Sequence, residues 1–200
     1  MNIARLRFGR LGIVALLGLT SACASSDLMT EIKRPKIAAN EQKATVVFLR
    51  ASSTAPNTTV TILDDKRRFL GDSLPGGCFV AQVDPGEHLF VGWAANTTAM
   101  EVSLEPKKIY YVDVVMRLGS VSARANLLRV DTSAEAKRAT RAALSDCTFY
   151  RADERAGARW LAEREPEAID RVRRAKEIAA RYTTEEQKQR RLLPEDGRSD

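Results

Sequence analysis

The stretch from residue 44 to residue 131 constrains the fold of this chain more than any other part. Short runs rich in Val, Ile, Thr, Phe and Tyr alternate with Gly, Pro, Asn and Asp at intervals of roughly ten residues, a spacing typical of a small all-β sandwich or barrel. We therefore predict a mainly β fold: a small antiparallel β-sandwich of seven to eight strands over 44–131. The predicted strands are 45–51, 58–63, 68–71, 78–83, 88–93, 100–104, 109–117 and 122–130.

The phrase Asp84-Pro85-Gly86-Glu87 lies between two of these runs. Its proline presets φ and its glycine accepts a positive φ, a combination that favours a tight reversal. We predict a β-hairpin over residues 78–93.

A second reversal is predicted at Glu105-Pro106-Lys107-Lys108, leading into a strand that begins at Ile109. Alternate residues of a strand point to opposite faces. We expect the more apolar face to point inward and Tyr111, on the other face, to lie partly exposed. The inward residues are Tyr110, Val112, Val114 and Met116.

The chain becomes helical in character from residue 132. Thr132-Ser133-Ala134-Glu135 fits a capping box in front of an alanine-rich run to about residue 144. A second helix is predicted over 154–163, and Glu165-Pro166 starts a third because proline is tolerated in a first turn. We predict a helical extension over 132–193 and a disordered tail over 194–200.

The third predicted helix carries a narrow apolar stripe. Its residues are Val172, Ala175, Ile178, Ala179 and Tyr182. Either these helices fold back on the β domain, or they bind another protein. Basic residues on the same helix alternate with acidic ones, so we expect them to neutralise one another.

The first 22 residues have the pattern of a secretory signal. Arg5, Arg7 and Arg10 stand before an apolar run over 11–22, with no acidic residue among them. As a helix this run would cover about 18 Å, whereas a bilayer core is about 30 Å thick. We do not expect it to be a permanent membrane span.

The signal ends in Leu19-Thr20-Ser21-Ala22-Cys23, which resembles a bacterial lipobox. The resemblance implies that the lipid is attached to Cys23, with Thr20 standing where the pattern usually has leucine. The alternative is an ordinary signal peptide cut near Ala22, which would leave Cys23 as a free thiol. No aspartate follows the cysteine, and by the same resemblance we expect the periplasmic face of the outer membrane. Residues 23–43 are predicted to be a flexible tether that holds the folded part about 25 Å from the headgroups.

Two cysteines remain once Cys23 is lipidated. Outside the cytoplasm, Cys78 and Cys147 are expected either to form a disulfide or to be two buried unpaired thiols. His88 is the single histidine, which argues against a His-rich metal site. We expect no metal and no cofactor.

Cys78 and His88 also form the chain's one candidate pair for catalysis, as a thiol nucleophile and its base. Asp84 or Asp113 would orient the ring. Because nothing in the sequence indicates an oxyanion site or a substrate cleft, we expect no enzymatic activity. The alternative is a periplasmic hydrolase or thiol enzyme using Cys78 and His88.

The net charge of +6 is a poor argument for nucleic acid. Three of the arginines belong to residues 1–22, and without them 29 basic residues face 26 acidic ones, a net charge of +3. We expect no nucleic-acid partner.

The phrases Asp84-Pro85-Gly86-Glu87-His88 and 105–112 (EPKKIYYV), set behind a lipobox, resemble an uncharacterised family of bacterial lipoproteins. Members carry a PG-x-H turn and a later G-K-x-YY strand start; this chain has Lys107 where glycine is common. The resemblance implies a compact β-sandwich, no agreed activity and no catalytic residues.

We therefore expect a lipid-anchored envelope protein that acts as a binding or scaffolding module. Its partners would be the membrane, through lipidated Cys23, and an envelope protein or cell-wall polymer, through the helical extension. Trp93 and Trp160 are expected in the core rather than exposed as stacking residues for a glycan.

Overall fold

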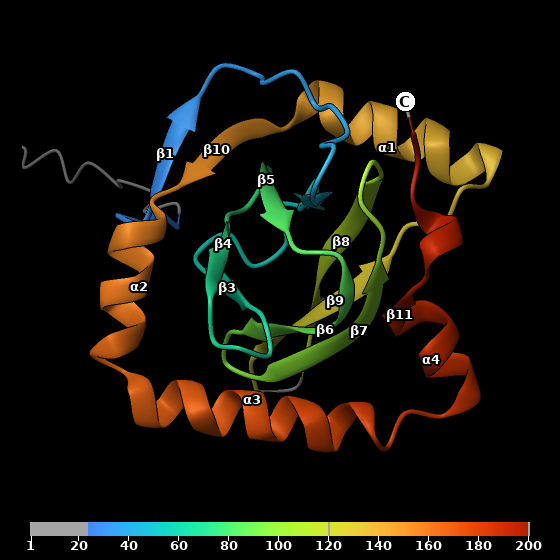
Figure 1. Cartoon of the computed structure of the whole chain (residues 1–200). Coiled ribbons are helices and arrows are strands. Elements are labelled where there is room, and N and C mark those ends of the chain that lie inside the picture. Colours follow the sequence, from blue (N-terminus) through green and yellow to red (C-terminus); the bar gives the residue numbers. More distant parts are fainter. Residues whose placement is uncertain (1–23, 120, 200) are drawn as a thin grey trace, which may run out of the picture.

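Two β-sheets and the helices around them make up the computed structural model, which describes residues 24–119 and 121–199 (Figure 1). The signal and Cys23 lie outside the described residues. The first sheet has the order β1 (Met29–Ile32), β10 (Thr148–Ala152), β5 (Gly77–Val83), β2 (Ala44–Leu49), β8 (Ile109–Leu118) and β9 (Ala123–Arg129). The second has the order β11 (Arg191–Leu192), β7 (Thr97–Leu104), β6 (Gly86–Trp93), β3 (Val60–Leu63) and β4 (Phe69–Ser73).

The main core lies where the two sheets face each other. The ring of Phe48 on β2 is 4.8 Å from that of Phe79 on β5 and 5.5 Å from that of Phe90 on β6 in the second sheet. Every residue of β2 is buried, as expected of a strand that is covered on both faces and is apolar except for Thr45.

The mainly β class is confirmed, and each of the eight predicted strands overlaps one in the structure. The expectation of purely antiparallel sheets is wrong. β2 pairs with β8, β5 with β10 and β7 with β11 in parallel. Long connections make these pairs, because a parallel neighbour has to be reached by a crossover.

The predicted hairpin over 78–93 is also wrong. β5 belongs to the first sheet and β6 to the second, so the turn at Pro85 and Gly86 (φ 116°) crosses between sheets. A reversal sets the direction of the chain but not its partner; β5 pairs with β2 and β10, whereas β6 pairs with β3 and β7. The turn over 105–108 makes the same kind of crossing, with Lys107 at φ 62°.

A second apolar cluster covers the outer face of the first sheet. Tyr111 is buried there, 6% exposed, which corrects the expectation that it lies partly in solvent. The inward face of its strand was predicted correctly. Tyr111 is covered because Ile37 of the N-terminal segment and Leu144 of α1 (Ala134–Asp146) pack into the same cluster.

The flexible tether predicted for 23–43 is not what the structure shows for residues 24–43. β1 lies in this segment and pairs antiparallel with β10, and Met29 is buried in the main core. The backbone N–H of Lys107 donates to the carbonyl of Asn40, 2.9 Å away. The segment is held because β10 offers it a strand edge and the core offers Met29 a site.

The helices lie around the sheets, with α1 along the top of Figure 1, α2 (Glu154–Ala162) at the left, α3 (Glu165–Ala179) along the bottom and α4 (Thr184–Arg190) at the right. The N-cap of α1 is Ser133, one residue after the predicted Thr132. None of the described helices is long and apolar enough to cross a membrane.

The stripe on α3 packs back onto the β domain, which decides between the two alternatives for the described residues. Val172, Ala175 and Ala179 are buried in the main core, and α3 lies against β7 and β6. Two of the basic residues outside the stripe pair locally, as expected: Arg173 contacts Asp170 and Glu177, and Arg174 contacts Asp170. Arg171 instead donates to the hydroxyl of Thr97 on β7.

The predicted disordered tail is packed over residues 194–199. Asp196 is buried, and its carboxylate accepts from the backbone N–H of Leu193 at 2.9 Å and from Arg129 at 3.3 Å. The backbone of Arg198 exchanges two hydrogen bonds with Ile109 at the start of β8. The backbone at the start of β8, where β9 does not pair with it, offers these bonds, a partner that sequence periodicity does not reveal.

Gly157 lets α2 approach β4 closely, and replacing it tests this packing. A Cβ on Gly157 would lie 2.0 Å from Cδ1 of Phe69, a buried core ring. We expect Gly157→Ala to lower the free energy of unfolding by about 2 kcal/mol through overpacking. Chemical denaturation measures this change. The adjacent, exposed Ala158→Ser is the control and should change it by less than about 0.5 kcal/mol; equal effects of the two variants would contradict the packing argument.

Candidate functional site

The described chain begins one residue after the predicted lipidation site. The backbone N–H of Ala24 donates to the carbonyl of Pro56 at 2.8 Å. The hydroxyl of Ser26 donates to Asp72 of β4, which also accepts from Thr61. Burial raises the pKa of the Asp72 carboxyl, and these two hydrogen bonds oppose the rise. The residue that follows Cys23 is therefore already part of the folded body.

Cys78 and Cys147 are joined by a disulfide, with their Cα atoms 5.8 Å apart. Cys78 is buried on β5, and Cys147 directly precedes β10, the parallel neighbour of β5. In this form the sulfur of Cys78 is bonded and is no thiol nucleophile. The rival hypothesis of a thiol enzyme rests on that nucleophile.

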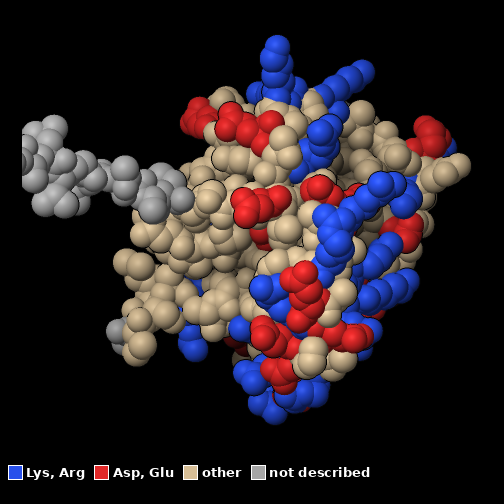
Figure 2. Space-filling view, turned by 90° about the vertical axis from the view of Figure 1, so that its left-hand side faces the viewer, with Lys and Arg blue, Asp and Glu red and all other residues tan. Residues whose placement is uncertain are grey.

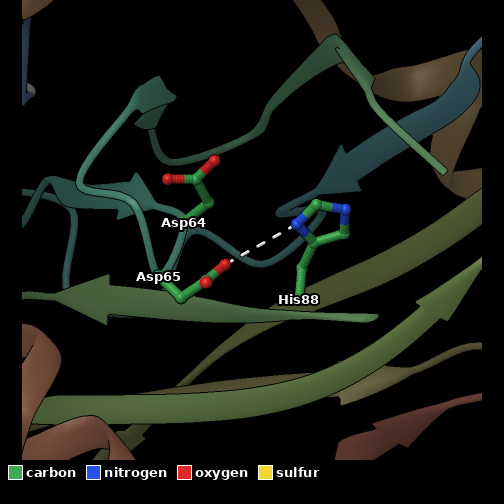
Figure 3. A group of neighbouring side chains, drawn as sticks. All are labelled: Asp64, Asp65 and His88. Carbon is green, nitrogen blue, oxygen red and sulfur yellow. Dashed lines mark ion pairs between the residues drawn. The ribbon is translucent and has the colours of Figure 1, made fainter. Parts of the chain in front are cut away.

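His88 lies on β6 and points its ring toward the β3–β4 turn (Figure 3). Its Nε2 is 2.8 Å from the carbonyl oxygen of Asp84. A carbonyl only accepts, so Nε2 carries the hydrogen in this arrangement. Nδ1 makes no hydrogen bond among the described residues and lies 3.6 Å from a carboxylate oxygen of Asp65.

The β3–β4 turn, residues 64–68, is organised by the fully buried Asp64. One of its carboxylate oxygens accepts from the backbone N–H groups of Lys66 and Arg68 at 2.9 and 2.8 Å, and the other accepts from Nε of Arg68. Arg67 adopts φ 61° inside this turn. The hydrogen bonds of Asp64 keep Asp65 where it faces His88.

Asp64, Asp65 and His88 place one potential ligand atom each within 4.8 Å of one another. Asp64 is occupied by its three N–H donors, so Nδ1 of His88 and the carboxylate of Asp65 are the atoms that could hold a cation. An imidazole nitrogen with a carboxylate oxygen suits a divalent transition metal, and a second ring nitrogen bonded to a carbonyl is the usual support for such a histidine.

Asp84 or Asp113 was predicted to orient the ring of His88. In the described structure neither of their carboxylates forms a hydrogen bond with it; Asp84 contributes its backbone carbonyl instead. The carboxylate of Asp84 lies 3.0 Å from Arg68 and 3.4 Å from Lys43, and hydrogen bonding to Arg68 and then Lys43 lowers its pKa. Asp113 lies on β8 and lines a different cavity, of about 370 Å³, with residues of α1.

Cavities flank the β3–β4 turn on two sides. One, of about 560 Å³, lies between the turn and the helices α2 and α3, and combines basic with apolar side chains. Its basic residues are Lys43, Lys66, Arg67 and Arg68, its acidic ones are Glu154 and Glu165, and its apolar ones include Phe69, Leu70 and Leu161. The other, of about 360 Å³, contains Asp65 and His88 together with Glu87 and Glu101. Pockets of this size accept small ligands.

Trp93 and Trp160 pack against each other, with ring centroids 5.1 Å apart, and both are partly buried at the edge of the main core. Arg171 lies over the ring of Trp93 and Arg164 over that of Trp160. The two rings belong to the packing between β6, α2 and α3.

Sequence reasoning identified His88 but missed Asp64 and Asp65. The signal was present as five consecutive charged residues, 64–68, between two predicted strands. It missed Arg50 as well, whose fully buried guanidinium donates to the carbonyls of Thr54, Ala55, Thr58 and Ser73. An arginine at the end of a strand gives no sequence sign that it turns inward.

No family model, curated protein or solved structure matches this chain.

The disulfide is expected to stabilise the fold by closing a loop of 69 residues. On the chain-entropy model, Cys147→Ala should lower the free energy of unfolding by about 4 kcal/mol. Denaturant titration with and without a reductant measures this. The reductant should lower the stability of the parent protein and leave the variant unchanged; a loss below about 1 kcal/mol would show that the bridge restrains little.

Asp113 should make the fold less stable as the pH rises. Burial raises its pKa above the ordinary 3.8, so the ionised form is disfavoured in the folded state. Stability therefore falls as the pH rises from 3.8 to the folded pKa. Asp113→Asn should remove this slope, giving a variant that is more stable than the parent at neutral pH and equal to it at low pH.

Asp131 supplies a comparison of opposite sign. Hydrogen bonds from Ser133 lower its pKa, so its stabilisation is present above pH 3.8 and is lost as the pH falls through the folded pKa. Asp131→Asn should therefore lower stability at neutral pH. Denaturation midpoints measured across pH test both variants, and a shift of the same sign in the two would refute the assignment.

Proposed function

We propose that this chain is a lipid-anchored protein of the bacterial cell envelope, acylated on Cys23 and held at the periplasmic face of the outer membrane. It acts as a binding or scaffolding module without catalysis. Its partners are the membrane and an envelope protein or cell-wall polymer, and nucleic acid is not among them. Its two sheets serve as a β-sandwich scaffold.

The observation that carries the proposal is that the folded body starts directly after the lipobox. The backbone N–H of Ala24 donates a hydrogen bond to the carbonyl of Pro56, so an acyl chain on Cys23 would attach to the body almost without a spacer. Two or more acyl chains make stable anchoring, and a folded domain joined this closely would stay at the lipid surface.

Two further features support the proposal. Lys107 has φ 62°, a conformation that glycine adopts readily, and this is the position where the lipoprotein family that the chain resembles commonly has glycine. The cavity of about 560 Å³ beside the β3–β4 turn offers four basic side chains against two acidic ones, Glu154 and Glu165, together with apolar side chains. Such a lining suits an anionic ligand that also carries an apolar part, and we place the binding site there.

The proposal is tested by mass spectrometry of the protein purified from bacterial membranes. We expect the processed chain to begin at Cys23 and to carry added fatty acid on that residue. Cys23→Ser should abolish the addition and shift the protein out of the outer-membrane fraction. Cys147→Ala is the matched control, because it also removes a sulfur and should leave the lipid in place. A parent chain without fatty acid would refute the anchor.

A further inference from the structure

Four connections lie together at one end of the two sheets, the end at which β2 reaches Leu49. Cys78 pairs with Leu49, Ser73 with Val60 and Trp93 with Thr61, which brings the connections 51–59, 74–76 and 94–96 to this end. β8 runs parallel to β2 and continues past Leu49, so the β8–β9 turn over 118–122 extends from the same end. We call these four connections the uncharged end.

None of the residues in these four connections is charged, in a chain whose residues are 29% Asp, Glu, Lys and Arg. The opposite end contrasts with this. Its connections are 40–43 (NEQK), 64–68 (DDKRR), 84–85 (DP) and 105–108 (EPKK), and each carries charge. Figure 2 shows the contrast on one face of the molecule, where charged side chains crowd the right-hand side and the left-hand side is largely uncharged. The contrast concerns the connections between the strands of 44–131. Beside them at the uncharged end lie Lys33 and Arg34, which follow β1, and Asp146, which precedes Cys147 and β10.

The N-terminal part of the chain joins the body at the uncharged end. The backbone N–H of Ala24 donates a hydrogen bond to the carbonyl of Pro56, which belongs to the connection 51–59. Buried Arg50 holds this connection from inside, through the carbonyls of Thr54, Ala55 and Thr58. A lipid on Cys23 would therefore enter the bilayer beside the uncharged end.

The β8–β9 turn adds exposed apolar side chains at this end. Leu118 is 79% exposed and Val121 is 96% exposed. Directly behind them, Arg117 and Arg124 are opposite each other across the two strands, and neither forms an ion pair with a described acidic residue. Like charges in that position repel each other. An anionic surface in front of the turn would relieve the repulsion between Arg117 and Arg124. Exposed apolar side chains with arginines directly behind them also suit the boundary between lipid headgroups and acyl chains.

We propose that the uncharged end is the membrane-contacting surface of the protein. Leu118 and Val121 enter the lipid interface, and Arg117 and Arg124 contact the phosphates of anionic phospholipids. This inference rests on the proposed anchor at Cys23 and adds to it an orientation, because an anchor alone would allow the body to rotate. The charged end then faces away from the bilayer.

The orientation is measured by the depth of a fluorescent probe. Ser122→Cys places a thiol on the exposed β8–β9 turn, and Lys66→Cys places a matched one on an exposed turn at the charged end. Acylated Cys23 and the disulfide do not react with a thiol-specific fluorophore. The labelled full chain is reconstituted in vesicles of phosphatidylethanolamine and phosphatidylglycerol that contain lipids with a nitroxide on the acyl chain. We expect quenching and a blue shift at position 122 and neither at position 66.

Mass spectrometry of the same samples separates the two proposals. Absent fatty acid defeats the anchor. An acylated protein with no quenching at 122, or with equal quenching at 66, defeats the orientation alone. Leu118→Asp with Val121→Asp, in the Ser122→Cys protein, should abolish quenching while acylation stays; persistent quenching would overturn the role of the apolar tip. Replacing phosphatidylglycerol by phosphatidylcholine should weaken quenching in the labelled Ser122→Cys protein, but not in the same protein that also carries Arg117→Gln and Arg124→Gln. Equal quenching of the labelled Ser122→Cys protein in both lipids would overturn the phosphate contact.

Discussion

The insertion of β10 between β1 and β5 is the constraint on which the rest of the structure depends. Among the described strands β1 pairs only with β10, so the N-terminal segment belongs to the sheet only because β10 does. The pairing of β10 with β5 covers three residue positions, a short parallel ladder that is weak by itself. The disulfide lies next to this ladder, because Cys147 directly precedes β10. One covalent bond thus stabilises the pairing that joins the N-terminal segment, the β domain and the helices into one body.

A second interior group defines where the N-terminus leaves the body. The guanidinium of Arg50 is fully buried and has no carboxylate partner among residues 24–119 and 121–199, and burial lowers its pKa. A buried charge is strongly unfavourable without partners. Here four backbone carbonyls accept from it, and three of them belong to the connection that also receives Ala24. The position of Ala24 on the body is therefore fixed by the hydrogen bonds of buried Arg50 to this connection, and not by the length of a linker.

The strands over 44–131 could be predicted because their apolar residues alternate with turn residues at short intervals. What the sequence could not supply was the partner of each strand. Asp84-Pro85-Gly86 indicated a reversal, and the chain does reverse there, but into the other sheet. β1 and β10 were missed because each is short and pairs with strands far away in the sequence: β1 and β10 are more than a hundred residues apart, and Thr148 of β10 pairs with Gly77 of β5.

The candidate site was predicted in part for the same reason. His88 was singled out by its chemistry, and its partners were sought among aspartates near it in sequence or on a predicted strand. Its real neighbour, Asp65, comes from a turn that lies beside β6 only because β3 and β6 pair in the second sheet. The buried carboxylate of Asp64 then organises that turn through hydrogen bonds to its own backbone. Local patterns indicate which residues carry chemistry, whereas sheet topology determines which of them meet.

In the proposed orientation, the connections at the uncharged end contact the membrane, and those at the charged end face away from it. β8 has ten residues and spans about 33 Å at about 3.3 Å per residue, from its start at the charged end to the β8–β9 turn. If the uncharged end rests on lipid, the cavities beside the β3–β4 turn lie about this far from the headgroups. A flexible tether would leave that distance to chance fluctuations. If Cys23 is acylated as proposed, the body begins directly after its anchor, and the length of a strand would set the distance. A ligand fixed in the cell wall would then bind at a constant distance from the membrane.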